Sequence, residues 1–201
     1  FETMSGFTTT GATIIDNVEA LPHGILFWRS LTQWIGGLGI VFFTVALLPS
    51  LVGGSTRVFA AEATGPVKTK LHPKLSMGAR WIWMVYLFIT FSCMGSYMFF
   101  GMDWFQGINY AMTSSATGGF SIHNNSTEFF NSPAIEYTTT FFCFLSGVNF
   151  TLLYFSAAKF KFKELWRDSE FQFYCLVILG FTAFIMVELM LRNHYDIEHA
   201  F

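Results

Sequence analysis

The sequence predicts an all-α polytopic membrane protein built from repeated units. Of its 201 residues, 53% are hydrophobic, 19% are aromatic and only 12% are charged, a composition that a water-exposed surface does not tolerate. Residues 4–14 and 112–122 superpose without a gap at an offset of 108 residues, so that Gly11 meets Gly119. Both copies are rich in Gly and hydroxyl side chains. This pattern is typical of re-entrant loops, whose backbone reaches membrane depth because it lines a polar path.

Four stretches are long and apolar enough to cross a bilayer, which requires about 20 residues at a rise of about 1.5 Å each. They are residues 24–51, 77–100, 133–158 and 171–191. In the first stretch, Gly36, Gly37 and Gly39 permit close helix packing or a bend. The sequence therefore predicts outer and inner helices on either side of each re-entrant loop.

A shorter apolar piece lies between the second and third spans, at residues 104–115. About a dozen residues reach only halfway across a bilayer, so this piece is predicted to be a pore helix that enters and turns back. Gly118 and Gly119 supply the turn. The polar return arm at residues 121–132 fits the wall of a water-filled vestibule.

Charge predicts the orientation of the spans. Residues 52–80 carry five Lys or Arg against one Glu, and residues 159–167 carry four against one, so both loops are expected to be cytoplasmic. The same topology predicts that the acidic residues on the outer side of the membrane include Asp16, Glu19, Asp103, Glu128 and Glu136.

This topology divides the chain into five parts. Residues 1–51 are the end of repeat 1, with the tail of a pore helix, a filter and an inner helix; residues 52–76 form a cytoplasmic loop. Residues 77–158 are repeat 2, with outer helix, pore loop and inner helix; residues 159–170 form a second cytoplasmic loop, and residues 171–201 begin repeat 3. Because the sequence does not start with Met and its first copy lacks an outer helix, we expect an internal fragment of a longer protein.

Three segments carry a resemblance to a known family: FTTTGAT at residues 7–13, WRSLTQWIGGLGI at 28–40 and GVNF at 147–150. They are similar to the membrane (pore) subunits of the bacterial Trk potassium uptake system, the TrkH-like members of the Trk/Ktr/HKT superfamily. The resemblance covers essentially the whole chain. It implies a multi-pass protein of the bacterial cytoplasmic (inner) membrane, with four units around a potassium-channel-like, pseudo-fourfold pore that is incomplete here.

The resemblance also implies one filter Gly per unit, here Gly11 and Gly119. Their backbone carbonyls can replace the hydration shell of potassium, and the absence of a Cβ lets the strand turn those carbonyls inward. The candidate filter residues are Thr9, Thr10, Gly11 and Ala12 in the first copy, and Ala116, Thr117, Gly118, Gly119 and Phe120 in the second. The second copy departs from an expected Thr-Thr-Ala-Gly-Phe pattern, which suggests a more permissive backbone at Gly118.

The implied partners are a second copy of the chain, in a homodimer, and a TrkA-like cytoplasmic nucleotide-binding ring that gates the pore. Potassium is the expected substrate, no cofactor is expected, and nothing in the composition suggests nucleic-acid binding. A sodium-coupled Ktr-type transporter and an alternating-access cation carrier are alternatives. An intramembrane enzyme is a remote one, because the four spans contain no His and the HExxH and GxSxG motifs are absent.

Three positions keep two interpretations each. Arg29 is either an interface anchor at a helix end or a member of an ion pair that supports the pore loops. Asn149 either bonds between helices or lines the pore. Residues 57–74 are either a solvated connector or a docking surface for the cytoplasmic ring.

Overall fold

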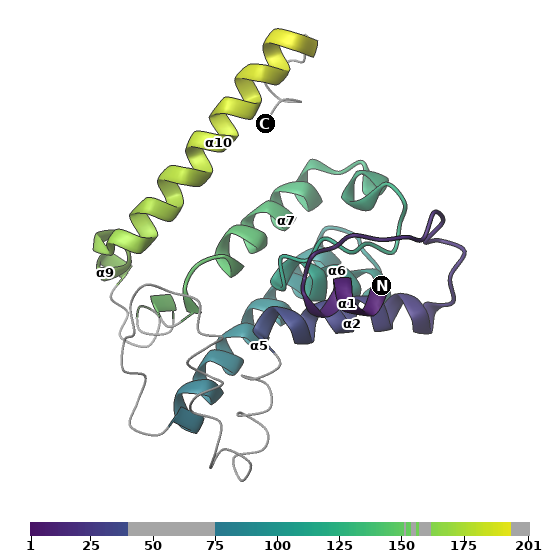
Figure 1. The fold of residues 1–201 in the computed structure, drawn as a ribbon, viewed down its shortest axis with the longest axis horizontal. Helices are drawn as coiled ribbons and strands as arrows, with labels where there is room; N and C mark the ends of the chain where they lie inside the picture. Colours follow the sequence, from purple (N-terminus) through teal and green to yellow (C-terminus); the bar gives the residue numbers. More distant parts are fainter. Residues whose placement is uncertain (40–74, 151, 154–155, 157–161, 194–201) are drawn as a thin grey trace. The chain divides into compact units, whose positions relative to one another are not determined.

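The computed structural model describes residues 1–39, 75–150, 152–153, 156 and 162–193, and every regular element in these ranges is helical. The chain divides into two compact units, Phe1–Thr151 and Leu152–Phe201. The first unit contains α1 (Glu2–Phe7), α2 (His23–Leu38), α5 (Leu75–Phe99), α6 (Trp104–Ser115), the 3-10 helix η2 (Ser126–Phe130) and α7 (Pro133–Ser146) (Figure 1). The second unit contains α9 (Phe162–Arg167) and α10 (Ser169–Asn193).

Two of the described helices are long and apolar enough to cross a membrane. These segments are Arg80–Phe99 within α5 and Ser169–Leu191 within α10. Both coincide with spans expected from the sequence. The Asp168 carboxylate caps the start of α10, because its Oδ1 accepts hydrogen bonds from the backbone nitrogens of Glu170 and Phe171 at 3.0 and 3.2 Å.

The expected inner helix of the first repeat ends early in the structure. α2 begins at His23 and ends at Leu38, where Gly39 adopts a φ of 79°. Glycine adopts this left-handed conformation without a steric penalty and commonly follows the last residue of a helix. The remainder of the expected span, residues 40–51, lies outside the described residues, as do residues 52–74 of the expected cytoplasmic loop.

The inner helix of the second repeat is interrupted at the corresponding position, where the sequence predicts one continuous span over residues 133–158. α7 ends at Ser146, Gly147 forms a turn, and the backbone at Val148 and Asn149 is not helical. Gly147 is a weaker helix former than the apolar residues around it, which hydropathy alone does not register. Since Leu38 and Ser146 are 108 residues apart, both copies of the repeat end their described inner helix at the same place.

The short helices α1 and α6 also end at corresponding residues, Phe7 and Ser115. α6 covers the range expected for a half-length helix. It starts with a capping box, in which Asp103 Oδ1 accepts from the backbone nitrogen of Gln106 at 2.9 Å and the Gln106 side chain accepts from the Asp103 nitrogen at 3.1 Å. At 12 residues, α6 is about 18 Å long, well short of a bilayer.

Within the first unit, α2 packs against α1 and α6, and α5 packs against α6 and α7. Two glycines of α2 allow the close approach that the sequence predicts. A Cβ at Gly36 would overlap the backbone of Phe7, and a Cβ at Gly37 would lie 2.7 Å from the Cα of Ala116. The ends of both short helices therefore lie directly against α2.

A buried tyrosine joins three helices of the second repeat. The Tyr97 hydroxyl of α5 lies 2.8 Å from Ser114 Oγ of α6 and 2.8 Å from Thr139 Oγ1 of α7. A buried hydroxyl without a partner costs roughly 1–3 kcal/mol, so these bonds fix α6 between its neighbours. Tyr86 links α5 to α2 in the same way, because its hydroxyl donates to the Trp34 carbonyl at 2.9 Å.

Candidate functional site: two adjacent glycine loops

The chain turns in the same way after α1 and after α6. We call residues 8–13 the first glycine loop and residues 116–121 the second glycine loop. Thr9 and Thr117 have φ angles of 51° and 52°, and Gly11 and Gly119 have φ angles of 76° and 80°. The residues that correspond in the sequence repeat therefore also share their backbone conformation at these two positions.

Positive φ is uncommon for a β-branched residue such as Thr and costs of order 1–3 kcal/mol. Hydrogen bonds to the preceding helix stabilise it in both loops. The Thr9 nitrogen donates to the Gly6 carbonyl at 2.9 Å, and the Thr117 nitrogen donates to the Ser114 carbonyl at 3.1 Å. Strained backbone that recurs at equivalent positions is typical of functional loops.

The two loops lie against each other. A Cβ built on Gly11 would overlap the carbonyl oxygen of Gly118, whereas a Cβ built on Gly119 would meet nothing within 4 Å. Gly119 is exposed, and Gly11 is half-buried. Thus Gly11 is required both by its dihedral angle and by the neighbouring loop, and Gly119 by its dihedral angle alone.

Arg29 of α2 bonds to both glycine loops. Its guanidinium is buried and donates from Nε to Glu2 Oε2 at 3.0 Å, from Nη2 to Thr13 Oγ1 at 3.3 Å and from Nη1 to the Ser121 carbonyl at 3.0 Å. Its central carbon also lies 4.2 Å from the centroid of the Phe120 ring, which adds a cation–π contact. Of the two interpretations of Arg29, the structure shows the ion pair.

Glu2 lies in α1, outside the two helices that could span a membrane. Burial alone raises the pKa of its carboxyl group. Hydrogen bonds from the Ile14 nitrogen, the Thr13 hydroxyl and Arg29, together with the charge of Arg29, outweigh burial, so the pKa lies below its ordinary value. Glu2 is therefore a carboxylate at neutral pH, and the Ile14 nitrogen donates to its Oε1 at 2.8 Å.

Gln33, one turn further along α2, bonds to the second glycine loop. Its side chain has no exposed surface. Gln33 Nε2 donates to the Gly118 carbonyl at 2.8 Å, and Gln33 Oε1 accepts from the Phe120 nitrogen at 3.1 Å. A Cβ at Gly118 would overlap the Gln33 carboxamide, so only glycine leaves room for this amide. The two hydrogen bonds of Gln33 fix the loop backbone before and after Gly119.

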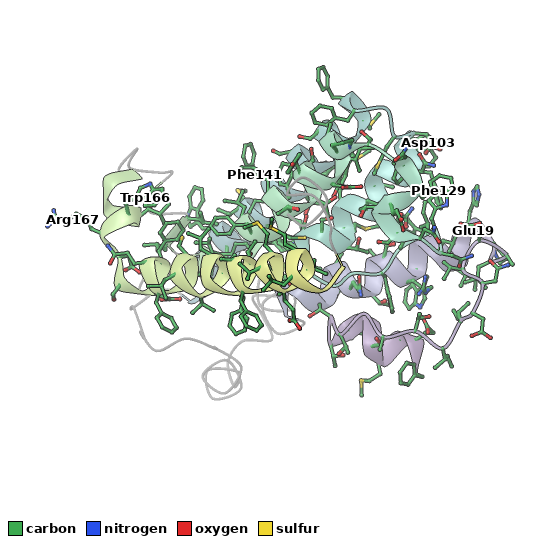
Figure 2. All side chains as sticks on the ribbon, turned by 90° about the horizontal axis from the view of Figure 1, so that it is seen from above. Glu19, Asp103, Phe129, Phe141, Trp166 and Arg167 are labelled. Carbon is green, nitrogen blue, oxygen red and sulfur yellow. The ribbon has the colours of Figure 1, made fainter. Side chains whose placement is uncertain are left out.

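Hydrogen bonds also join the segments that follow the two glycine loops, residues 14–22 and 122–132. Asn124 accepts at Oδ1 from the Val18 nitrogen at 2.9 Å, and its own nitrogen donates to Glu19 Oε1 at 3.2 Å. The ring of His123 stacks on Phe129 with centroids 3.6 Å apart. Figure 2 shows Glu19 and Phe129 at the same end of the first unit as Asp103, which caps α6.

The structure separates the nine candidate residues into groups by exposure. Ala116, Gly118 and Phe120 are buried; Thr9 and Gly11 are half-buried; Thr10, Ala12, Thr117 and Gly119 are exposed. The Thr10 hydroxyl lies 2.8 Å from the Thr8 hydroxyl, and the Thr117 hydroxyl donates to the Ala116 carbonyl at 2.7 Å, so both bond to their own loops. Sequence reasoning missed Gln33 and Glu2, although a polar residue one turn from Arg29 in an apolar helix is a recognisable signal.

Comparison with known proteins decides the family. The family model described as TrkH, a cation transport protein, matches residues 1–197. The chain belongs to the TrkH family. The crystal structure of the potassium transporter TrkH from Vibrio parahaemolyticus resembles it with a TM-score of 0.79 and 32% identity, covering 99% of this chain and 40% of that one. The fold is that of a helical membrane transporter.

Curated relatives of this TrkH-family chain have the name Trk system potassium uptake protein. TrkH of Salmonella typhimurium is 38% identical over 98% of the chain and 41% of its own length, and TrkH of Escherichia coli is 38% identical over 96% and 40%. TrkG of Escherichia coli is 37% identical over 100% and 42%. The chain thus spans about two fifths of the length of these TrkH-family relatives.

Proposed function

We propose that this TrkH-family chain contributes two strands of the selectivity filter through which potassium enters the bacterial cell, and that it is not an enzyme. The observation that carries the proposal is the recurrence of one strained turn, with a glycine at positive φ, at the ends of two short helices that both pack against α2. The names of the relatives support the same substrate, since they are potassium uptake proteins.

The proposed ligands of potassium are the backbone carbonyl oxygens of Gly11 and Gly119. Neutral carbonyls suit a weakly hydrated monovalent ion, whereas a divalent ion needs carboxylates. The Glu2 carboxylate, which the contacts above place beside the first glycine loop, is engaged by Arg29 and by the Ile14 nitrogen. Ala116 and Phe120, which are buried, would support the second strand without contacting the ion through their side chains.

The proposed setting is a multi-pass protein in the cytoplasmic membrane. The excess of Lys and Arg in residues 52–80 and 159–167 supports a cytoplasmic position for both loops. The proposed partners are a second copy of the polypeptide and a cytoplasmic nucleotide-binding ring; for the ring, the support is the word system in the names of the relatives.

The test replaces Gly119 by Ser in the complete gene product, expressed in a bacterial strain that lacks its own potassium uptake. A side chain at Gly119 meets no neighbouring atom, so the change acts through the backbone angle of 80° and not through steric overlap. We expect the sodium concentration that halves rubidium uptake to fall about tenfold, the size of change that a strain of order 1–3 kcal/mol would produce.

Gly24→Ala is the control, because Gly24 is exposed in α2 and has no atom within 4 Å of a built Cβ. It should transport as the unmodified protein does. A Gly119→Ser protein that is present in the membrane and discriminates against sodium as well as the unmodified protein contradicts the filter assignment.

A further inference from the structure

Gln33 bonds to two consecutive peptide groups of the second glycine loop. One is the peptide between Gly118 and Gly119, whose carbonyl accepts from Gln33 Nε2 at 2.8 Å. The other is the peptide between Gly119 and Phe120, whose N–H donates to Gln33 Oε1 at 3.1 Å. A single buried carboxamide therefore fixes the peptide planes on both sides of Gly119.

The second of these bonds determines where the Gly119 carbonyl points. In a trans peptide the C=O and the N–H of the same plane point in opposite directions, and the structure has no cis peptide among its described residues. Because the Phe120 N–H points at Gln33, the Gly119 carbonyl points away from Gln33 and from α2. Gly119 is exposed, so this oxygen leaves the packed interior of the unit.

We propose that Gln33 is a positioning residue for cation selection: it orients the Gly119 carbonyl oxygen toward the permeating ion. This inference rests on the proposed function, which makes that oxygen a ligand of potassium. Gly119 needs such a partner because glycine has the widest choice of backbone angles and no side chain to restrict it. Without the Gln33 amide, both peptide planes could rotate, and the distance between the carbonyl and the ion would no longer select for size.

The hydrogen bonds of Gln33 connect a helix of the first repeat to the glycine loop of the second repeat, and the corresponding residue of the second repeat makes no such connection. Position 141 corresponds to Gln33 at the repeat offset, and it is occupied by Phe141, whose side chain is 58% exposed. The second inner helix therefore offers no amide at this position. The first repeat thus orients the ion ligand of the second.

The test compares three variants of the complete gene product in the rubidium uptake assay. Gln33→Leu keeps the volume but removes both hydrogen bonds, and Gln33→Asn keeps the amide on a stem about 1.5 Å shorter that cannot reach both partners. Ser30→Ala is the control, since Ser30 is equally buried in α2 but bonds only to the Leu26 carbonyl of its own helix, at 3.3 Å. Membrane content is measured by immunoblot for each variant.

We expect the sodium concentration that halves rubidium uptake to fall about tenfold in Gln33→Leu, by less in Gln33→Asn, and not at all in Ser30→Ala. If either Gln33 variant is present in the membrane with unchanged discrimination, the inference is wrong. If both Gln33 variants disappear from the membrane while Ser30→Ala is present, Gln33 serves folding, and the inference is also wrong. If the unmodified protein takes up no rubidium, the proposed function itself fails, a separate result.

Discussion

At the scale of single residues, the site is organised by buried polar side chains of α2. Arg29 is 4% exposed, and its guanidinium bonds to Glu2 in one repeat and to the Ser121 carbonyl in the next. A planar guanidinium carries five N–H donors in a rigid fork and can reach acceptors on different sides, whereas the three donors of a Lys ammonium all lie on one nitrogen. Arg29 and Gln33 together attach the second glycine loop to a helix of the first repeat.

We expect Arg29→Met to destabilise the protein, because it leaves the Glu2 carboxylate without its cation. Breaking a fully buried ion pair costs about 3–5 kcal/mol, and the loss here should be smaller because the Glu2 side chain is 19% exposed. Arg29→Lys should also destabilise the protein, by less. The measurement is the thermal unfolding midpoint of the purified complete gene product in detergent.

The double variant Arg29→Met/Glu2→Met provides the control for this prediction. If the pair is coupled, the double variant should unfold at a higher temperature than Arg29→Met alone. Equal unfolding midpoints for the double variant and Arg29→Met would show that the unpaired Glu2 carboxylate does not destabilise the protein, which contradicts the prediction.

At the scale of elements, the decisive contact is between α2 and the ends of the two short helices. Gly37 makes this contact possible, because a Cβ there would lie 2.7 Å from the Cα of Ala116 and 2.8 Å from the Tyr86 hydroxyl. Ala116 is the first residue of the second glycine loop. Any change that moves α2 away from α6 therefore also moves this loop.

Gly37→Ala is expected to lower stability by about 1–3 kcal/mol, the usual result of placing an extra methyl group in a packed interface. It should also weaken discrimination against sodium, since Ala116 must shift. Gly24→Ala is the matched substitution in the same helix; with open space around it, it should leave stability unchanged or raise it by up to about 1 kcal/mol. Thermal unfolding and the rubidium assay measure both effects, and identical behaviour of the two variants would show that Gly37 is not confined.

Some helix bounds and the glycine correspondence could be predicted from the sequence. The ends of two helices and the role of Gln33 could not, for physical reasons. The bounds of α6 follow from a half-length apolar segment, and the correspondence of Gly11 with Gly119 follows from the sequence repeat. The ends of α2 and α7 do not, because hydropathy continues past Gly39 and Gly147 although the helices stop there. The role of Gln33 was also invisible, since its partner Gly118 is 85 residues away in sequence.

At the scale of the whole molecule, the proposed function makes the two glycine loops half of a four-stranded, pseudo-fourfold filter. Two adjacent strands leave the exposed backbone of Gly119 open on one side, and an unsatisfied backbone group at membrane depth costs several kcal/mol. We therefore expect further loops of this kind to complete the pore.

It follows that residues 1–201 alone should not conduct. Expressed in a strain without potassium uptake, they should fail to restore growth at limiting potassium, whereas the complete gene product should restore it. Growth on the segment alone would mean that several copies assemble one pore, and the proposal of four units in one polypeptide would be wrong.

The orientation of the molecule is tested separately. A single cysteine at Ser76, in a protein otherwise free of cysteine, should resist an impermeant maleimide in intact cells and react after permeabilisation, because the Lys and Arg excess predicts a cytoplasmic position for this residue. Labelling of intact cells would reverse the predicted topology.

The bond between Gln33 and Gly118 has a consequence for how the ribosome delivers this protein to the bilayer. Chains are made from the N-terminus at roughly 5–20 residues per second, so the 85 residues that separate the two partners require roughly 4 to 17 s to synthesise. During that interval α2 carries a primary amide with no acceptor from the nascent second repeat. Until residues 118–120 are made, this amide needs other hydrogen-bond partners, and a pause in translation between the repeats would lengthen this stage.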